Sequence, residues 1–208
     1  MLLTRRISRE FAGNAMQNYK NMDNLQTRFN KKIKLDLQQK LGVKNPMATP
    51  KLVKIVVNMG VKDAVADKKN IERAGKALEQ ITGQKPRIAK AKKSVASFKL
   101  REGDPIGVVV TLRGKRMYDF YEKLVSIVFP RLKDFHGINR NSFDGRGNYA
   151  IGFSEYAVFP EVDPSTVERV QGLEVIVVTS ATKDSDALTL LEILGTPFKK
   201  EVALPSNR

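Results

Sequence analysis

The 208-residue sequence predicts a single α+β domain, a mostly antiparallel sheet with helices packed on one face. The order of the segments predicts this class, because apolar residues at helical spacing alternate with β-branched runs as helix, strand, helix, strands, helix, strand, strand and helix. A hydrophobic content of 41% suffices for one substantial core or two small ones, and no repeat or linker divides residues 23–200. We expect the second face of the sheet to stay open for a partner.

The composition of residues 1–22 predicts a flexible basic leader. We assign the folded domain to residues 23–208. Glu10 is the only acid in the leader. Its cations are Arg5, Arg6, Arg9 and Lys20. An Arg-rich, acid-poor start is also typical of an organelle transit peptide, and a main domain that begins near Met22 is equally compatible.

Apolar residues at every fourth position predict the first helix, which begins near Asn24 and stops at Gly42. These positions are Leu25, Phe29, Ile33, Leu37 and Leu41. After two Pro-containing turns, residues 52–59 are β-branched and predict a strand that ends at Gly60. The order therefore opens as helix then strand.

A second helical stripe follows, with Asp67 as a possible cap and Gly83 after its end. Its members are Ile71, Ala74, Leu78 and Ile81. Residues 106–112 then read as a strand, and Gly114 separates that strand from the next helix.

The third helical face is predicted to end at Pro130. Its members are Met117, Phe120, Tyr121, Leu124 and Val128. Residues 131–149 form a loop too long for a simple connection, and we interpret it as a candidate contact surface. The last elements are a strand near residues 149–159, a strand at 173–179, and a helix from a cap at Asp184 or Ser185 through Leu194.

Charge is distributed unevenly along the chain. Lys and Arg number 37 against 22 Asp and Glu, for a net charge of +15. Residues 1–100 carry 23 cations and 7 anions, a net +16, whereas residues 101–208 carry 14 and 15. Such a field attracts polyanions without distinguishing DNA, RNA and an anionic bilayer.

The sequence excludes several classes of chemistry. There is no Cys and only one His, His136, so disulfides, thiolate zinc sites and any site with two imidazoles are absent. We assign His136 no role, and expect no catalytic residue, metal site or cofactor. No apolar run of about 18 residues predicts a membrane span. The acidic clusters at 161–163 and 184–186 are interpreted as a turn and a helix cap.

Residues 85–101 are the densest cationic segment, with seven basic residues and no acid. The cations are Lys85, Arg87, Lys90, Lys92, Lys93, Lys99 and Arg101. The small residues Ser94, Ala96 and Ser97 allow close backbone approach, and Phe98 can stack on an exposed base. This combination favours nucleic-acid binding over a merely solvated loop, and favours RNA mildly.

A G-x-G sequence lies within residues 143–149. It precedes a strand, whereas a dinucleotide fingerprint follows a strand and opens a helix. We therefore interpret it as a turn with glycines at positive φ, which leaves Arg146 available to a phosphate or an acidic partner.

Short motifs along the chain carry a family resemblance. They are Asn58-Met59-Gly60-Val61, Ala66-Asp67-Lys68-Lys69, Gly83-Gln84-Lys85-Pro86, Lys92-Lys93-Ser94-Val95-Ala96, Val110-Thr111-Leu112-Arg113-Gly114, Pro130-Arg131-Leu132-Lys133-Asp134-Phe135, residues 142–149, Phe159-Pro160-Glu161 and Pro197-Phe198. Together they resemble the bacterial type of the universal large-subunit ribosomal protein family number five, which binds 5S ribosomal RNA in the central protuberance. The resemblance runs from about Leu25 to Lys200.

The resemblance implies two RNA contacts. In that family the sheet face holds 5S RNA, which places hydrogen-bonding residues at Asn58, Gln84 and Thr111, with phosphate attraction from Lys85, Arg87 and Arg113. A projecting loop of the family reaches the elbow of transfer RNA in the peptidyl site. The matching residues here are Lys90, Lys92, Lys93, Ser94, Val95, Ala96, Ser97 and Phe98.

The resemblance also implies a structural, non-enzymatic component of the large subunit. Its further partners would be 23S-type large-subunit rRNA, neighbouring large-subunit proteins, and a small-subunit head protein that meets the 131–149 loop and its neighbouring strand. The location would be a cytoplasmic ribosome, with an organellar ribosome also compatible because of the basic leader. Lys62 and Ser97 stand where the family usually has glycine, and the leader has no counterpart.

Other functions stay open from the residues alone. A metal-dependent RNA phosphodiesterase would hold RNA on the basic face and Mg²⁺ on carboxylates, and would show Mg²⁺-dependent cleavage. A generic basic RNA-binding protein would show no preference among RNAs. A peripheral membrane binder would insert the apolar stripe of helix 24–41, although core packing explains that stripe better.

Overall fold

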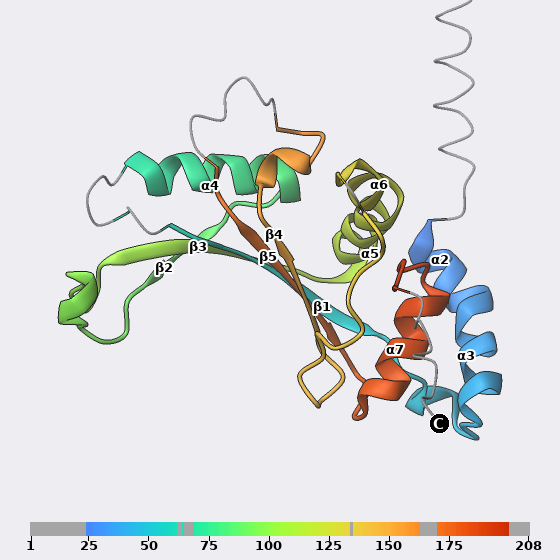
Figure 1. Cartoon of the computed structure of the whole chain (residues 1–208). Coiled ribbons are helices and arrows are strands. Elements are labelled where there is room, and N and C mark those ends of the chain that lie inside the picture. The colour runs from blue at the N-terminus through green and yellow to red at the C-terminus, as the bar shows by residue number, and fades with distance from the viewer. Residues whose placement is uncertain (1–23, 62–63, 65–68, 134, 163–169, 200–208) are drawn as a thin grey trace, which may run out of the picture.

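Five strands form one antiparallel sheet in the order β2-β3-β1-β5-β4 (Figure 1). The structure is a computed structural model and describes residues 24–61, 64, 69–133, 135–162 and 170–199. The strands are β1 (Leu52–Gly60), β2 (Arg87–Lys90), β3 (Pro105–Leu112), β4 (Tyr149–Phe153) and β5 (Leu173–Thr179). The predicted α+β class with an antiparallel sheet is confirmed.

Helices cover one face of this sheet and one of its ends. The helical segments are α2 (Leu25–Arg28), η1 (Phe29–Ile33), α3 (Lys34–Leu41), η2 (Pro46–Ala48), α4 (Lys69–Thr82), η4 (Ala96–Phe98), α5 (Gly114–Lys123), η5 (Leu124–Val128), α6 (Phe129–Arg131), η6 (Tyr156–Val158) and α7 (Asp184–Ile193). Figure 1 shows α4 and α5 on the same side of the sheet. The pair α3 and α7 packs together at the end away from β2.

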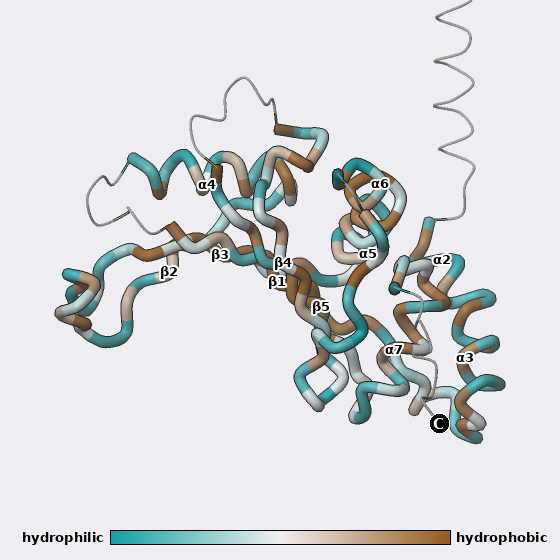
Figure 2. Tube along the Cα trace, viewed as in Figure 1, coloured by the Kyte–Doolittle hydropathy of each residue, from teal (hydrophilic) through white to brown (hydrophobic). Residues whose placement is uncertain are grey.

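The strands bury one face and leave the other open, because side chains alternate along a strand. On β5, Leu173, Val175 and Val177 are buried while Glu174 is exposed. The buried side chains join those of the helices in one hydrophobic cluster, and Figure 2 shows apolar residues concentrated along the central strands. The face opposite the helices is therefore the surface on which the sheet can meet a partner.

The central strand ties the two halves of the chain into one domain. β1 pairs with β3 on one side and with β5 on the other, through Ile55 opposite both Leu112 and Val177. Its neighbours thus come from much later in the sequence. Neither half has a complete sheet without the other.

The first helix runs without interruption from Leu25 to Leu41 and includes one wider π turn, η1. Residues four apart on an α-helix of 3.6 residues per turn drift by about 40° per step, so a strict four-residue spacing would carry Leu37 away from Leu25. The wider turn corrects the drift, and both side chains are buried. Gly42 ends the helix at φ 62°, as predicted.

Four main differences separate the observed elements from those predicted. The strand near 149–159 ends at Phe153, because its partner strand begins at Leu173 and the next residues form the turn η6. The helix that begins with α5 continues through η5 and α6, passes Pro130 in its last turn and ends at Arg131, after which Leu132 is extended.

The other two differences concern β2 and α7. The cationic segment begins with a strand, because residues 87–90 pair with β3. The N-cap of α7 is Lys183, and Asp184 is already helical. Residues 1–22, Lys62 and the possible cap Asp67 lie outside the described residues.

Candidate nucleic-acid interface

The open sheet face is built from rows of side chains that run across the strands. In one row Arg87 of β2 lies opposite Val109, Val109 opposite Asn58, Asn58 opposite Glu174, and Glu174 opposite Gly152 of β4. In the neighbouring row Thr111, Val56, Ile176 and Ala150 stand side by side. These residues are exposed or half-buried, so the open face presents a few polar side chains among mostly β-branched ones.

Asn58, Gln84 and Thr111 are brought together at this face. Asn58 and Thr111 lie on paired strands in adjacent rows, and the Gln84 Nε2 donates to the Thr111 carbonyl oxygen at 3.3 Å. Gly83, with φ 64°, ends α4 and turns the chain toward the sheet, while the Gln84 N–H donates to Thr82 Oγ1 at 3.4 Å. The turn after α4 thus places Gln84 beside Thr111 of β3.

The cations predicted for phosphate contact surround these three residues. Arg87 projects from the open face in the same row as Asn58. Arg113 follows Thr111 by two residues in extended backbone, so it continues on the same side, and Lys85 follows Gln84 directly. All three cations are exposed. The structure therefore gathers five of the six predicted sheet-face residues around one region of the open face, and Lys85 lies next to Gln84 in the chain.

Beyond the paired residues of β2 and β3, residues 91–104 form a projecting arm that extends away from α5 and α7 (Figure 1). The base of the arm is closed by backbone bonds from Ala91 N to Asp104 O at 2.8 Å and from Gly103 N to Ala91 O at 3.0 Å. Nearer the tip, Val95 pairs with Leu100 and the Ser94 Oγ accepts from Glu102 N at 3.0 Å. The arm is hydrogen-bonded along its length.

Every side chain from Lys92 to Lys99 is exposed. Phe98 lies in the turn η4 at the tip and is 77% exposed, which is unusual for an aromatic ring with no core to join. Lys99 takes the left-handed conformation with φ 51°, and no other non-glycine residue in the described ranges has a positive φ. Ser97 therefore occupies its position without the backbone conformation that would require glycine.

The loop that contains the G-x-G sequence is held by two aspartates. The N–H groups of Gly145 and Gly147 donate to the Asp184 carboxylate at 3.1 and 2.7 Å, so an internal anion occupies the place that a phosphate would take. Both glycines have positive φ, 79° and 76°, as the turn interpretation requires. Asp184 is thus a tether between α7 and this loop, and its interpretation as a helix cap was wrong.

Asp144 supports the same loop from inside. Its carboxylate accepts from the Asn148 side chain at 2.6 Å, from Asn148 N at 3.0 Å and from Arg146 N at 2.8 Å. These donors, with the Asn148 side chain first, lower the pKa of Asp144. Arg146 is exposed on this fixed turn, where it is available to a phosphate or an acidic partner.

Sequence reasoning missed the contacts that attach the 131–149 loop to the end of the domain. Ile138 N donates to Pro197 O at 2.8 Å, and Lys199 N donates to Ile138 O at 3.0 Å. Arg140 pairs with Glu192 at 2.9 Å. The sequence of neither segment indicates this contact, because most of its hydrogen bonds use backbone groups that lie about 60 residues apart.

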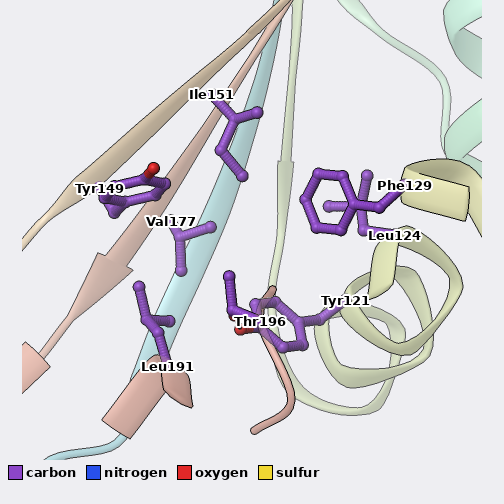
Figure 3. Close-up of a pocket in the computed structure, with 8 residues that line it drawn as sticks. All are labelled: Tyr121, Leu124, Phe129, Tyr149, Ile151, Val177, Leu191 and Thr196. Atoms are coloured by element: carbon purple, nitrogen blue, oxygen red, sulfur yellow. Dashed lines mark hydrogen bonds between the residues drawn. The ribbon is translucent and has the colours of Figure 1, made fainter. Parts of the chain in front are cut away.

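A small pocket between the sheet and α5 belongs to the core (Figure 3). Its lining is Tyr121, Leu124, Phe129, Tyr149, Ile151, Val177, Leu191 and Thr196. The Tyr121 and Thr196 hydroxyls share a hydrogen bond, and burial raises the pKa of Tyr121. Because its walls are almost wholly apolar, the pocket is explained by core packing and not by a ligand.

Two further observations concern the alternative functions. Within the described residues, no three His, Cys, Asp or Glu side chains are grouped so that they could hold a metal ion. The described helices include none long and apolar enough to cross a membrane. His136 is exposed in its loop.

Two family models match consecutive parts of the chain. Residues 45–101 match the model described as ribosomal protein L5, and residues 105–198 match the model for the C-terminus of the same ribosomal family. The first match holds β1 and β2, and the second holds β3, β4 and β5. The boundary between them falls in the projecting arm, although the strands from both sides interleave in one sheet.

Proposed function

The chain belongs to the ribosomal protein L5 family, and on that premise we propose that it holds 5S ribosomal RNA on its open sheet face and touches peptidyl-site transfer RNA with its projecting arm. Membership makes it an rRNA-binding structural protein of the large ribosomal subunit that serves translation, located in the ribosome of the cytoplasm or of an organelle. The family is one of structural proteins and not of enzymes.

The observation that carries the 5S proposal is the meeting of Asn58, Gln84 and Thr111 on one uncovered face. Neutral hydrogen-bonding groups suit a folded RNA, because they fix register on ribose and base edges while cations supply sequence-independent attraction. Arg87 and Arg113 lie beside them for that second task. The face therefore has both the polar points and the charge that such a complex needs.

The arm supports the transfer RNA proposal by its shape and charge. It presents Lys92 and Lys93 together with an exposed ring at Phe98, clear of the sheet face. Exposed cations attract phosphates, and an aromatic ring can stack on an unpaired base. An arm of this kind can reach a second RNA while the face holds the first.

The remaining partners belong to the same proposal. They are 23S-type large-subunit rRNA, neighbouring large-subunit proteins and a small-subunit head protein. The 131–149 loop fits the last of these, because the tether to Asp184 fixes its shape and Arg146 stays exposed. The division of residues 1–22 as a leader and 23–208 as the domain is proposed with it.

The test separates the two RNA contacts. Neutralising the arm with Lys92→Gln and Lys93→Gln is expected to weaken transfer RNA binding and to spare 5S RNA. Replacing Asn58, Gln84 and Thr111 with Ala should have the opposite effect. Lys40→Gln with Lys44→Gln removes the same charge from the far end of the molecule and serves as the control. Equal loss of both RNAs in both variants would contradict the division.

The first measurement is a salt-titrated gel shift with 5S RNA, using transfer RNA and an unrelated duplex RNA as competitors. The electrostatic part of binding falls with salt, whereas shape recognition resists competitors. Competitor-resistant binding of 5S RNA is the expected result. Equal displacement by every RNA would reduce the chain to a basic domain without specificity.

A further inference from the structure

Glu174 is the only acidic residue in the five strands. It is exposed at the open face, where all other charged strand residues are cations. Because an acid at this place opposes the attraction of a basic protein for phosphate, it weakens general RNA binding. Because Glu174 lies on the open face directly opposite Asn58, we look for a benefit to RNA binding that offsets this cost.

The contact with Asn58 indicates what the carboxylate does. The Asn58 Nδ2 donates to Glu174 Oε2 at 3.3 Å across the β1–β5 pair. A carboxylate only accepts, so this bond turns the amide nitrogen toward Glu174 and leaves the Asn58 carbonyl oxygen available. The pair thus offers two hydrogen-bond acceptors to RNA, the Asn58 carbonyl oxygen and the Glu174 carboxylate.

The surroundings of Glu174 allow a nucleotide to come close. Glu174, Ile176, Ala150 and Gly152 line an open groove, and Asp144 is also among its lining residues. A Cβ added at Gly152 would meet nothing within 4 Å, so the space above this residue is empty of protein. Two carboxylates flank the groove, which disfavours phosphate and favours groups that donate hydrogen bonds.

The row of Arg87, Val109, Asn58 and Glu174 places opposite charges on β2 and β5. Three strand spacings separate them, which is roughly 14 Å. A phosphate attracted by Arg87 is therefore too far away to be shared with Glu174. The Arg87 end of the row suits the phosphate backbone of an RNA, and the Glu174 end suits RNA groups that donate hydrogen bonds.

We propose that Glu174 is a specificity-determining residue, which accepts hydrogen bonds from ribose 2′-hydroxyls or base amino groups of the bound RNA and keeps a phosphate backbone off this part of the sheet. This inference rests on the proposed use of the open face for 5S RNA. It adds that the acid lowers general affinity while it raises affinity for the correct RNA.

Glu174→Gln tests the proposal because it keeps the size of the side chain and removes the charge. Loss of one charge-assisted hydrogen bond should lower 5S affinity about tenfold. The same change should raise affinity for an unrelated duplex RNA, since a repulsive charge is gone. The two affinities are measured at one salt concentration, and urea unfolding checks that the variant is folded. A rise of both affinities by the same factor would overturn the proposal.

Two more variants keep the result interpretable. Glu79→Gln removes an exposed acid from α4 on the helix-covered side, and should change both affinities by the same small factor. Gly152→Ala adds a methyl group to the groove without an internal clash, and should weaken 5S binding while stability is kept. Unchanged 5S affinity in Gly152→Ala would also count against a nucleotide in the groove.

Failure here differs from failure of the proposed function. If the wild-type chain binds 5S RNA against competitors and Glu174→Gln keeps the same preference for 5S RNA, only the proposed role of Glu174 is contradicted. If the wild-type chain shows no preference for 5S RNA over the competitors, the proposed function itself is contradicted.

Discussion

At the scale of single residues, the loop at 144–148 shows how a few polar groups fix a shape. Asp144 gathers donors from within the loop, and Asp184 takes the two glycine N–H groups from outside. The glycine spacing was enough to predict the turn. The tether to Asp184 was not predictable, because the carboxylate lies 37 residues beyond Gly147 and looks like an ordinary helix start.

The same local limit applies to the interface residues. Alternation along β1 and β3 predicts that Asn58 and Thr111 can share a face, but the resemblance, and not the alternation, singled them out. The register that sets Glu174 against Asn58 depends on a pairing across 116 residues. Glu174 was therefore overlooked, although an acid within a β-branched strand of a basic protein is a usable signal.

The two loop glycines differ in their surroundings and predict different costs of substitution. Gly145 and Gly147 have similar positive φ, but a Cβ would meet nothing near Gly145, whereas at Gly147 it would lie 2.7 Å from the Ala181 oxygen. Gly145→Ala should cost about 1 kcal/mol of unfolding free energy. Gly147→Ala should cost at least about 1 kcal/mol more, because backbone must shift. Urea unfolding of both variants measures this, and equal losses would contradict it.

Asp144 predicts a pH dependence of the loop. Because its donors favour the ionised form, its folded pKa lies below the ordinary value of 3.8. The stabilisation is therefore complete above the unfolded pKa and is lost as pH falls through the lower folded pKa. Amide NMR signals of Arg146 and Asn148 should titrate with a midpoint below 3.8, and the transition should vanish in Asp144→Asn. A midpoint at or above that value would contradict the hydrogen-bond network.

At the scale of elements, periodicity predicted most of the helices and strands. It missed β2, since four residues rich in cations carry no apolar alternation and become a strand only because β3 offers an edge. It also missed the π turns η1 and η5. The four-residue spacing of Leu25, Phe29 and Ile33 was itself the signal, because an unmodified α-helix cannot keep that spacing on one face.

The wider turn η1 predicts which leucine of α3 matters. Leu37 is fully buried, whereas Leu35 is 58% exposed. Leu37→Ala should lower the unfolding free energy by about 2–5 kcal/mol. Leu35→Ala removes the same atoms from the surface and should change it by less than about 0.5 kcal/mol. Thermal or urea unfolding of the pair decides this, and similar effects would show that the helix has another register.

At the scale of the whole molecule, charge and shape are separated along the sheet. The arm carries cations beyond one end, while the middle of the open face holds Asn58, Thr111 and Glu174. Composition predicted the basic half and its affinity for polyanions. It did not predict that the face would be nearly neutral at its centre, because that depends on which strands become neighbours.

This separation predicts different salt responses for the two RNAs. Lys92→Gln with Lys93→Gln should reduce the slope of log affinity against log salt for transfer RNA by about 2, one unit for each phosphate that is no longer neutralised. The slope for 5S RNA should stay the same, because the arm is not part of the sheet face. Gel shifts at four or five salt concentrations give both slopes. An equal reduction for 5S RNA would show that one surface serves both RNAs.

The place of β1 in the sheet also determines when the fold can form during synthesis. β1 leaves the ribosome early, yet one of its neighbours is β3 and the other is β5, which ends at Thr179. At about 5–20 residues per second, many seconds pass before both partners have emerged. Throughout that time the central strand of the sheet has two unpaired edges. Most of this chain is therefore translated before its central strand can be enclosed.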